Sequence, residues 1–146
     1  MTALATDRLT QLKSTCVKAY PVKASVTIYA GAMVMLDTNG YALPAANTAS
    51  CICVGIARAK VVGGTSSGDT WVLVDAPILA LLAASSITQA MVGRAMYVVD
   101  DQTVDDVAGN VFAGILMEYV STTSGWVLVS AHYNPPLTDV TSSAAE

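Results

Sequence analysis

The chain contains one apolar pattern twice, and this internal duplication is the feature that most limits the folds it can adopt. The matched segments, in chain order, are GAMVMLD at 31–37 with GRAMYVVD at 93–100, VGIARAKV at 54–61 with AGILMEYV at 113–120, and WVLVDA at 71–76 with WVLVSA at 126–131. Their separations shorten from 62 to 59 to 55 residues, so only the connecting loops differ in length. Retained strand-like segments with variable loops predict a duplicated all-β unit, with copies at about 30–76 and 92–131.

The segments between the matches carry turn signals that favour an antiparallel arrangement. The alternation of Val26 and Ile28 with Thr27 and Tyr29 is typical of a half-buried strand. The Asn-Gly pair at 39–40 tolerates the positive φ that tight hairpin turns require. Short strands joined by such turns predict a mainly antiparallel small barrel or sandwich, and a closed barrel would protect exposed strand edges.

One short helix is expected between the two copies, near residues 86–92. Ser86 and Gln89 have the spacing of a capping box, and Gly93 would end the helix. The remaining layout is an extended N-terminal arm at 1–24, one β domain at 25–134 and a flexible tail at 135–146 after two consecutive prolines.

The composition is unusually poor in charge for a soluble domain. Of the 146 residues, 53% are hydrophobic and 12% charged, with a mean hydropathy of +0.54, whereas about 25% charged residues is usual. The longest apolar run, 76–84, is far short of the roughly 20 residues of a membrane span, and the N-terminus lacks the apolar region of a signal peptide. A soluble protein whose apolar surface is covered by partners fits best, and a compact β domain with a neutral surface is the alternative.

The charges are unevenly distributed along the chain. The first 30 residues carry Arg8, Lys13, Lys18 and Lys23 against a single Asp7, whereas the whole chain has a net charge of −4. An acidic body would repel nucleic acid, and four basic residues are too few for a nucleic-acid footprint. A basic arm suits docking to an acidic protein surface, and an ordinary chain terminus is the alternative.

The cysteines predict buried reduced thiols. Cys51 and Cys53 are two apart in a strand-like run and therefore share a face. Cys16 makes the count odd and no C-x-x-C occurs, which favours folding in a reducing cytoplasm. Zinc would need about four ligands, and His132 is the only histidine.

Three patterns could carry chemistry, and each departs from what the chemistry needs. GGTSSGDT at 63–70 resembles a phosphate-binding loop, but Asp69 stands where the lysine belongs and a strand follows in place of a helix. Ser130, His132 and Asp139 suggest a triad without a nucleophile elbow. A weak calcium candidate, with a solvated hairpin tip as its alternative, consists of Asp100, Asp101, Asp105 and Asp106.

Two tryptophans occupy matching places in the two copies. Trp71 and Trp126 each precede Val-Leu-Val. They could stack on a sugar, but aromatic residues dominate cores and interfaces, and duplication favours pseudo-symmetric packing. We interpret both as core or interface aromatics.

The order of these elements resembles the tailed-phage head decoration proteins, also called capsid cement proteins. The resemblance lies in AGAMVMLDTNGYALPAANTASCICVGIARAKV, GGTSSGDTWVLV and the second-half series ITQAMVGRAMYVVDDQTV, VFAGIL and SGWVLV, and it covers about residues 24–133. It implies a β-rich fold that trimerises and binds the outer face of an expanded head.

The resemblance further implies a structural virion protein, with no enzymatic activity and no cofactor. It would be made in the host cytoplasm, bridge subunits of the major capsid protein and have no nucleic-acid or membrane partner. Family members often dock through an N-terminal arm. From their charge alone, we expect Arg8, Lys13, Lys18 and Lys23 to contact the capsid. A carbohydrate-binding or adhesion module is the alternative function.

Overall fold

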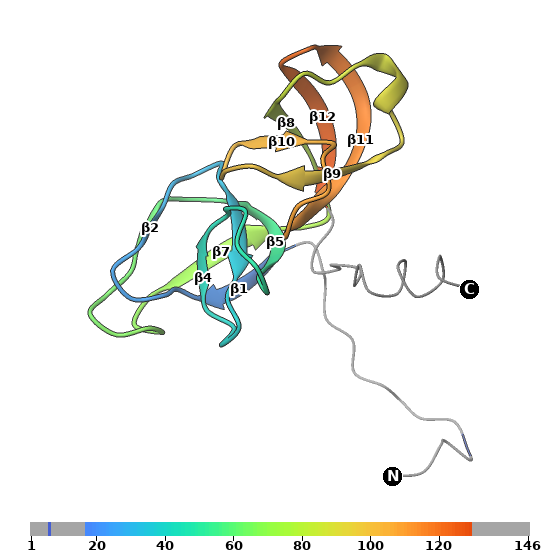
Figure 1. The fold of residues 1–146 in the computed structure, drawn as a ribbon. Helices are drawn as coiled ribbons and strands as arrows, with labels where there is room; N and C mark the ends of the chain where they lie inside the picture. The colour runs from blue at the N-terminus through green and yellow to red at the C-terminus, as the bar shows by residue number, and fades with distance from the viewer. Residues whose placement is uncertain (1–5, 7–16, 130–146) are drawn as a thin grey trace, which may run out of the picture.

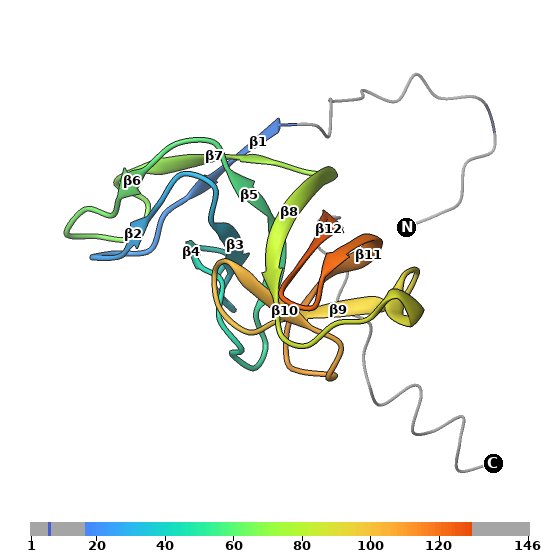
Figure 2. The ribbon, with the colours of Figure 1, turned by 90° about the horizontal axis from the view of Figure 1, so that it is seen from above.

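The computed structural model describes residue 6 and residues 17–129, which fold into two β lobes placed side by side (Figures 1 and 2). The strands of lobe 1, defined as residues 17–75, are β1 Val17–Pro21, β2 Thr27–Ile28, β3 Met33–Leu36, β4 Ala42–Pro44, β5 Ile52–Ala57, β6 Val61–Val62 and β7 Trp71–Asp75. The elements of lobe 2, defined as residues 78–129, are β8 Ile78–Ala84, the 3-10 turn η1 Gln89–Met91, β9 Ala95–Val98, β10 Thr103–Asp105, β11 Phe112–Ser121 and β12 Ser124–Val129.

The two lobes have the same strand topology. The sheet of lobe 1 has the order β1-β7-β5-β3-β4, and that of lobe 2 has the order β8-β12-β11-β9-β10. Lobe 2 is a closed barrel because β8 also pairs in parallel with β10. In lobe 1 an isolated parallel bridge joins Val22 to Ala42 at the corresponding place. The prediction of an all-β, mainly antiparallel small barrel or sandwich is confirmed, and lobe 2 takes the form of a closed barrel.

The backbone hydrogen bonds outside the ladders repeat from lobe to lobe. Equivalent pairs are Gly31 N to Ala57 O (2.9 Å) with Gly93 N to Leu116 O (2.7 Å), and Lys23 N to Ala42 O (2.9 Å) with Ser85 N to Val104 O (3.0 Å). Equivalent donor and acceptor residues in the two lobes lie 59 or 62 residues apart in the chain, as the first two sequence matches do. The duplication therefore covers the five strands of each main sheet and these turns, whereas the β2–β6 ribbon belongs to lobe 1 alone.

A β-bulge recurs at the same place in both lobes and explains two glycines. The register of β3 against β5 shifts next to Gly55, and that of β9 against β11 shifts next to Gly114. A Cβ at Gly55 would collide with the carbonyl oxygen of Asp75, and one at Gly114 with that of Leu128. The bulged strand presses against its neighbour so closely that only glycine fits.

The repeat is longer than the sequence match indicates, because β1 and β8 are also equivalent. β1 pairs with β7, and β8 pairs with β12, both antiparallel. Residues 17–21 of the expected arm 1–24 are therefore part of a sheet, and the prediction of an arm is wrong for that segment. Residues 78–84, expected within the linker between copies, form the seven-residue strand β8.

The WVLV match is two residues out of the structural register. Val22 N donates to Thr70 O (2.9 Å) as Ala84 N donates to Thr123 O (2.8 Å), which places equivalent residues of β7 and β12 53 apart. A shift of two keeps every side chain on its face. Trp71 therefore corresponds to Ser124, and the expected equivalence of Trp71 with Trp126 is wrong.

The expected helix near 86–92 is only a 3-10 turn at Gln89–Met91. Ser86 has a φ of 55°, which lies in the left-handed region and cannot begin a right-handed helix. Thr88 takes the N-cap position without a side-chain cap hydrogen bond. The capping-box spacing is present in the sequence, but the left-handed backbone at Ser86 does not place its side chain at the N-cap of a helix.

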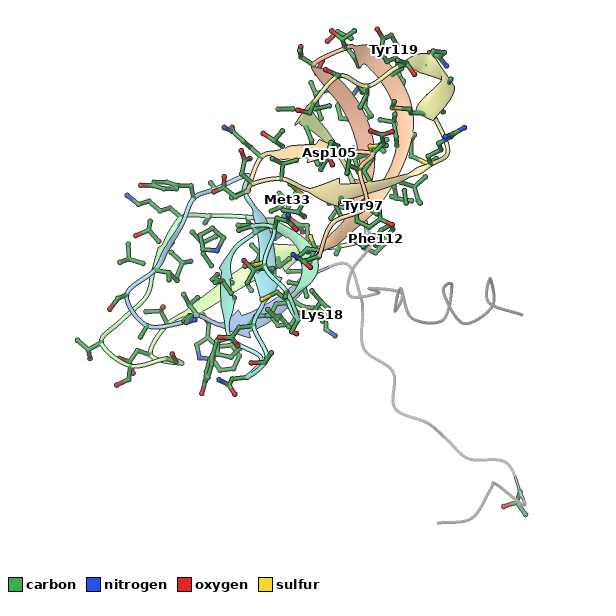
Figure 3. All side chains as sticks on the ribbon, viewed as in Figure 1. Lys18, Met33, Tyr97, Asp105, Phe112 and Tyr119 are labelled. Atoms are coloured by element: carbon green, nitrogen blue, oxygen red, sulfur yellow. The ribbon has the colours of Figure 1, made fainter. Side chains whose placement is uncertain are left out.

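Two hydrophobic clusters form the core, and one of them joins the lobes. The interior of lobe 1 contains Val34, Val54, Val72 and Val74. The second cluster fills the interior of lobe 2 and extends to the opposite face of β3 and β5, where its members are Met33, Met35 and Cys53, together with Cys51 just before β5. Lobe 1 thus contributes its outer face to the core of lobe 2, and Met33 lies between the lobes (Figure 3).

Candidate functional site

The outer surface of lobe 2 carries rows of apolar side chains that cross several strands. One row consists of Leu79, Leu128, Ile115 and Ala95, which pair in succession across β8, β12, β11 and β9. Leu81 and Trp126 pair in the next row. We call these six residues the apolar rows. In a strand one face usually meets the core and the other meets water, but here both faces are apolar.

Two residues of the apolar rows are well exposed to solvent, and the other four are partly buried. Leu79 is 48% exposed and Leu81 is 53% exposed, and the neighbouring Met117 is 50% exposed. Glu118, which pairs with Trp126, is the charged residue that borders them on β11. Contiguous apolar surface of this kind marks an interaction site more often than a solvated face.

Lobe 1 has a salt bridge where lobe 2 has apolar side chains. Asp75 takes the place of Leu128, and Arg58 takes that of Met117. The Arg58 Nε lies 2.9 Å from the Asp75 Oδ1. Equivalent positions in the fold therefore hold an ion pair in lobe 1 and apolar side chains in lobe 2. The difference indicates that the apolar character of lobe 2 is not required by the fold itself.

The two tryptophans lie on the outer surface, so neither is a core residue. Trp71 is 58% exposed at the start of β7 and pairs with Pro21 of β1. Trp126 is half-buried within the apolar rows. The core part of the sequence interpretation is wrong, because the Val residues between the outward positions supply the inward-facing side chains.

Two of the four basic residues expected to contact a capsid lie in the described structure. Lys18 projects from β1 and is exposed. The Lys23 Nζ lies 3.7 Å from the Asp37 Oδ2, so part of its charge is already neutralised within the chain. Arg8 and Lys13 lie outside the described residues. The capsid-contact assignment stays a prediction.

Two of the four aspartates of the acidic loop accept hydrogen bonds from backbone N–H groups of the same loop. Asp100 accepts a hydrogen bond from Gln102 N (2.9 Å), and Asp105 accepts one from Val107 N (3.2 Å). Asp101 and Asp106 are the other two aspartates of the calcium candidate. Within residues 17–129 no cluster of three or more His, Cys, Asp or Glu side chains is placed to hold a metal ion. The weak calcium candidate is thus not assembled as a site.

The glycine-rich loop between β6 and β7 is closed by its own aspartate. The Asp69 carboxylate accepts a hydrogen bond from Ser66 N (3.0 Å) and fills the space next to Gly64. A carboxylate in that position repels phosphate. β7 follows directly, so a strand and not a helix comes after the loop, as the sequence indicated. The loop is not a hairpin, because β6 pairs with β2 and β7 pairs with β1 and β5.

Cys51 and Cys53 are both buried free thiols on one face, as predicted. Burial raises the pKa of the Cys53 thiol to about 11. Burial also raises the pKa of Cys51, and the nearby Asp37 adds to that shift. Raised thiol pKa values make both cysteines poor nucleophiles. Cys16 lies outside the described residues.

Neither of two open hollows in the described part of the chain gathers reactive groups. One, of about 420 Å³, lies between the lobes and is lined by Tyr29 to Ala32 together with Asp101 and Gln102. The other, of about 180 Å³, is bordered by Asn47, Asp105 and the loop 107–109. Each contains one carboxylate and no neighbouring base, which is too little for acid–base or nucleophilic chemistry.

Other predicted positions fall outside the described residues. These are the triad candidates Ser130, His132 and Asp139, residues 130–134 of the expected β domain, and the expected tail 135–146. In the part that the structure describes, no helix has the length and hydropathy to cross a membrane.

Sequence reasoning missed the apolar rows, although their signal is present. APILALLAA at 76–84 is apolar at every position, so its periodicity cannot separate a strand with two apolar faces from a buried segment. Only the structure shows that Leu79 and Leu81 point outward, because they are about half exposed while Leu82 and Ala84 on the other face of β8 are buried.

Comparisons of the chain with protein-family models, with curated proteins and with solved structures give no match.

Proposed function

We propose that the chain is a structural virion protein that decorates the outer surface of a tailed-phage head. In this role it binds the major capsid protein lattice as a homotrimer and stabilises the shell. The observation that carries the proposal is the set of apolar rows on lobe 2, where Leu79 and Leu81 are about half exposed. A protein that acts by adhesion needs apolar surface to bury against its partners. A chain with only 12% charged residues has apolar surface available for this.

The double-lobed architecture supports the same proposal. Both copies keep the five strands of the main sheet and its bulge, while the residues that could carry chemistry differ between them. The loop aspartate Asp69 and the thiols Cys51 and Cys53 have no counterpart of the same type in lobe 2. Duplication preserved a scaffold, which suits a protein that acts by its surface.

The N-terminal residues are our candidate for the capsid contact, and the structure limits where they can be cut. β1 begins at Val17 and pairs with β7 over five residues. Removing residues 1–16 keeps this pairing and deletes Arg8 and Lys13. Removing residues 1–24 also deletes β1, so it would unfold lobe 1.

Head binding by the 1–16 deletion tests the proposal. Purified heads that lack the protein are mixed with the full chain, the deletion, or a matched control lacking residues 135–146. Binding is then measured by sedimentation with the heads. We expect the full chain and the control to bind and to raise the melting temperature of the heads, and the 1–16 deletion to bind at least tenfold more weakly. Failure of the full chain to bind heads would refute the function, and full binding by the deletion would refute the docking role of residues 1–16.

A carbohydrate-binding or adhesion module is a second candidate, supported by one observation. Trp71 is 58% exposed on a sheet surface, as a sugar-stacking residue would be. Glycan binding by the isolated protein that is lost in Trp71→Ala and kept in Val62→Ala would favour this function over the first.

A further inference from the structure

The internal duplication identifies what covers one exposed face of lobe 2. In lobe 1 the outer face of β3 and β5 consists of Met33, Met35, Cys53 and Ile56. The equivalent residues of β9 and β11 are fixed by the pairing registers, and they are Ala95, Tyr97, Phe112 and Ile115. We call these four residues the β9–β11 face.

In lobe 1 this face is already covered by another lobe of the same fold. Met33, Met35 and Cys53 are 0%, 1% and 2% exposed, and all belong to the core cluster that fills lobe 2. Met33 N donates to Asp101 O across the junction at 2.7 Å. The contact between the lobes is thus an apolar face of one lobe seated on one end of the next.

The β9–β11 face has the same chemistry but lacks this cover in the chain as described. Its four residues are all apolar or aromatic, and each is only partly buried. Tyr97 and Phe112 pack edge to face, with ring centroids 6.0 Å apart and planes at 77°, and Figure 3 shows them beside one another on lobe 2. Two ordered aromatic rings on a half-exposed face are suited to an interface.

A receiving end for this face is also present, on lobe 1. Val98 and Val111, at the end of lobe 2 that lobe 1 covers, are 2% and 0% exposed. Their equivalents in lobe 1 are Leu36 and Ile52, and both are only partly buried. Lys18, which is exposed, is the equivalent of Ala80 in the covered end. Lobe 1 therefore has an end that the chain's own second lobe leaves uncovered.

We infer that a second copy of this chain occupies the β9–β11 face through this end of its lobe 1. The contact between the lobes within one chain is then repeated between chains, head to tail. A heterologous contact of this kind closes into a ring when its rotation permits. The inference rests on the proposed function only for the number of copies, which is three, so that six similar lobes alternate around the ring.

The first experiment measures mass by light scattering for the full chain and two variants. One chain has a mass of 15.0 kDa, so a ring of three has three times that mass. Phe112→Asp places a charge in the β9–β11 face, and we expect its mass to fall to that of one chain. Val62→Asp is the matched control, because Val62 is 56% exposed on the β2–β6 ribbon, away from lobe 2 (Figures 1 and 2). It keeps the mass of the full chain.

The second experiment separates a head-to-tail contact from a symmetric one. Ile52→Lys damages the receiving end and leaves the β9–β11 face intact, and Lys18→Glu replaces it if the first variant does not fold. Each variant alone is a single chain, but an equimolar mixture of Phe112→Asp with the receiving-end variant has one intact contact. We expect the mixture to form pairs of twice the single-chain mass.

The outcomes separate this inference from the proposed function. A Phe112→Asp variant that keeps the full mass, or a mixture that gives no pairs, overturns the head-to-tail contact even if the full chain binds heads. A full chain that is a single 15.0 kDa species also overturns it. A full chain that forms the ring but binds no heads refutes the function and leaves the contact standing.

Discussion

Alanine at the two bulge glycines tests whether close strand approach is a structural requirement of the repeated unit. Gly114 has ordinary backbone geometry, but its Cβ would meet the carbonyl group of Leu128, whose carbon lies 2.8 Å away. Gly55 has a φ of 140°, and its Cβ would also meet the Cγ1 of Val74 at 2.6 Å. Gly40 has a φ of 84° with open space around it. The three positions thus separate backbone strain from steric collision.

The expected losses of unfolding free energy follow from these contacts. A left-handed backbone costs a non-glycine residue roughly 1–2 kcal/mol, and alanine returns about 0.4–1 kcal/mol by restricting the unfolded chain. Gly40→Ala should therefore lose about 1 kcal/mol. Overpacking costs about 1–3 kcal/mol, and Gly114→Ala should reach the upper end because backbone atoms cannot rotate away. Gly55→Ala combines both effects and should lose about 4 kcal/mol.

Urea unfolding, followed by circular dichroism, measures these differences. A change in midpoint with an unchanged slope reports stability alone. The order of destabilisation should be Gly55, then Gly114, then Gly40. If Gly114→Ala loses no more than Gly40→Ala, the strands can separate without cost, and the bulge does not require glycine.

Three further predictions concern a buried thiol, the core and a loop. Burial raises the pKa of the Cys53 thiol from 9.0 to about 11 in the folded chain. The folded state therefore holds this proton more tightly, and the free energy of unfolding should fall by up to about 3 kcal/mol as pH rises from 9 to 11. Urea midpoints across this pH range measure the fall, with Cys53→Ala as the control. Leu116→Ala should lose about 2–5 kcal/mol and Met117→Ala under about 1 kcal/mol, because Leu116 is fully buried and Met117 half exposed; equal urea midpoints would contradict the placement of β11. Asp69→Ala should lower the thermal midpoint by a few degrees by removing the bond to Ser66, whereas Asp69→Asn should keep most of it.

The fold class was predictable because it depends on local patterns. Alternating apolar residues, turn dipeptides and three matched segments are all readable along the chain, and each leads to an antiparallel β structure. The extent of the repeat was not readable. β1 and β8 are equivalent strands with no identical residue at equivalent positions, because pairing with β7 and β12 does not require particular side chains.

The sequence predicted that the chain would have an apolar interaction surface, but not where that surface lies. The shortage of charge indicated that apolar surface would need partners, but it could not say which strand faces carry that surface. Trp71 and Trp126 were found from the sequence, yet their outward direction depends on pairing with Pro21 and Leu81. Period-two alternation fixes which residues share a face and leaves open which face meets the core.

The sequence by itself determined that the body is a duplicated β scaffold, with Cys51 and Cys53 on one buried face and without a recognisable catalytic motif. Only the tertiary structure decided that the outer face of β3 and β5 is the core of the neighbouring lobe, while its counterpart, the β9–β11 face, stays partly exposed. The physical reason is that burial depends on contacts between segments distant in the chain. Two apolar faces at equivalent places in the fold differ in burial because another lobe is packed against one of them and not against the other.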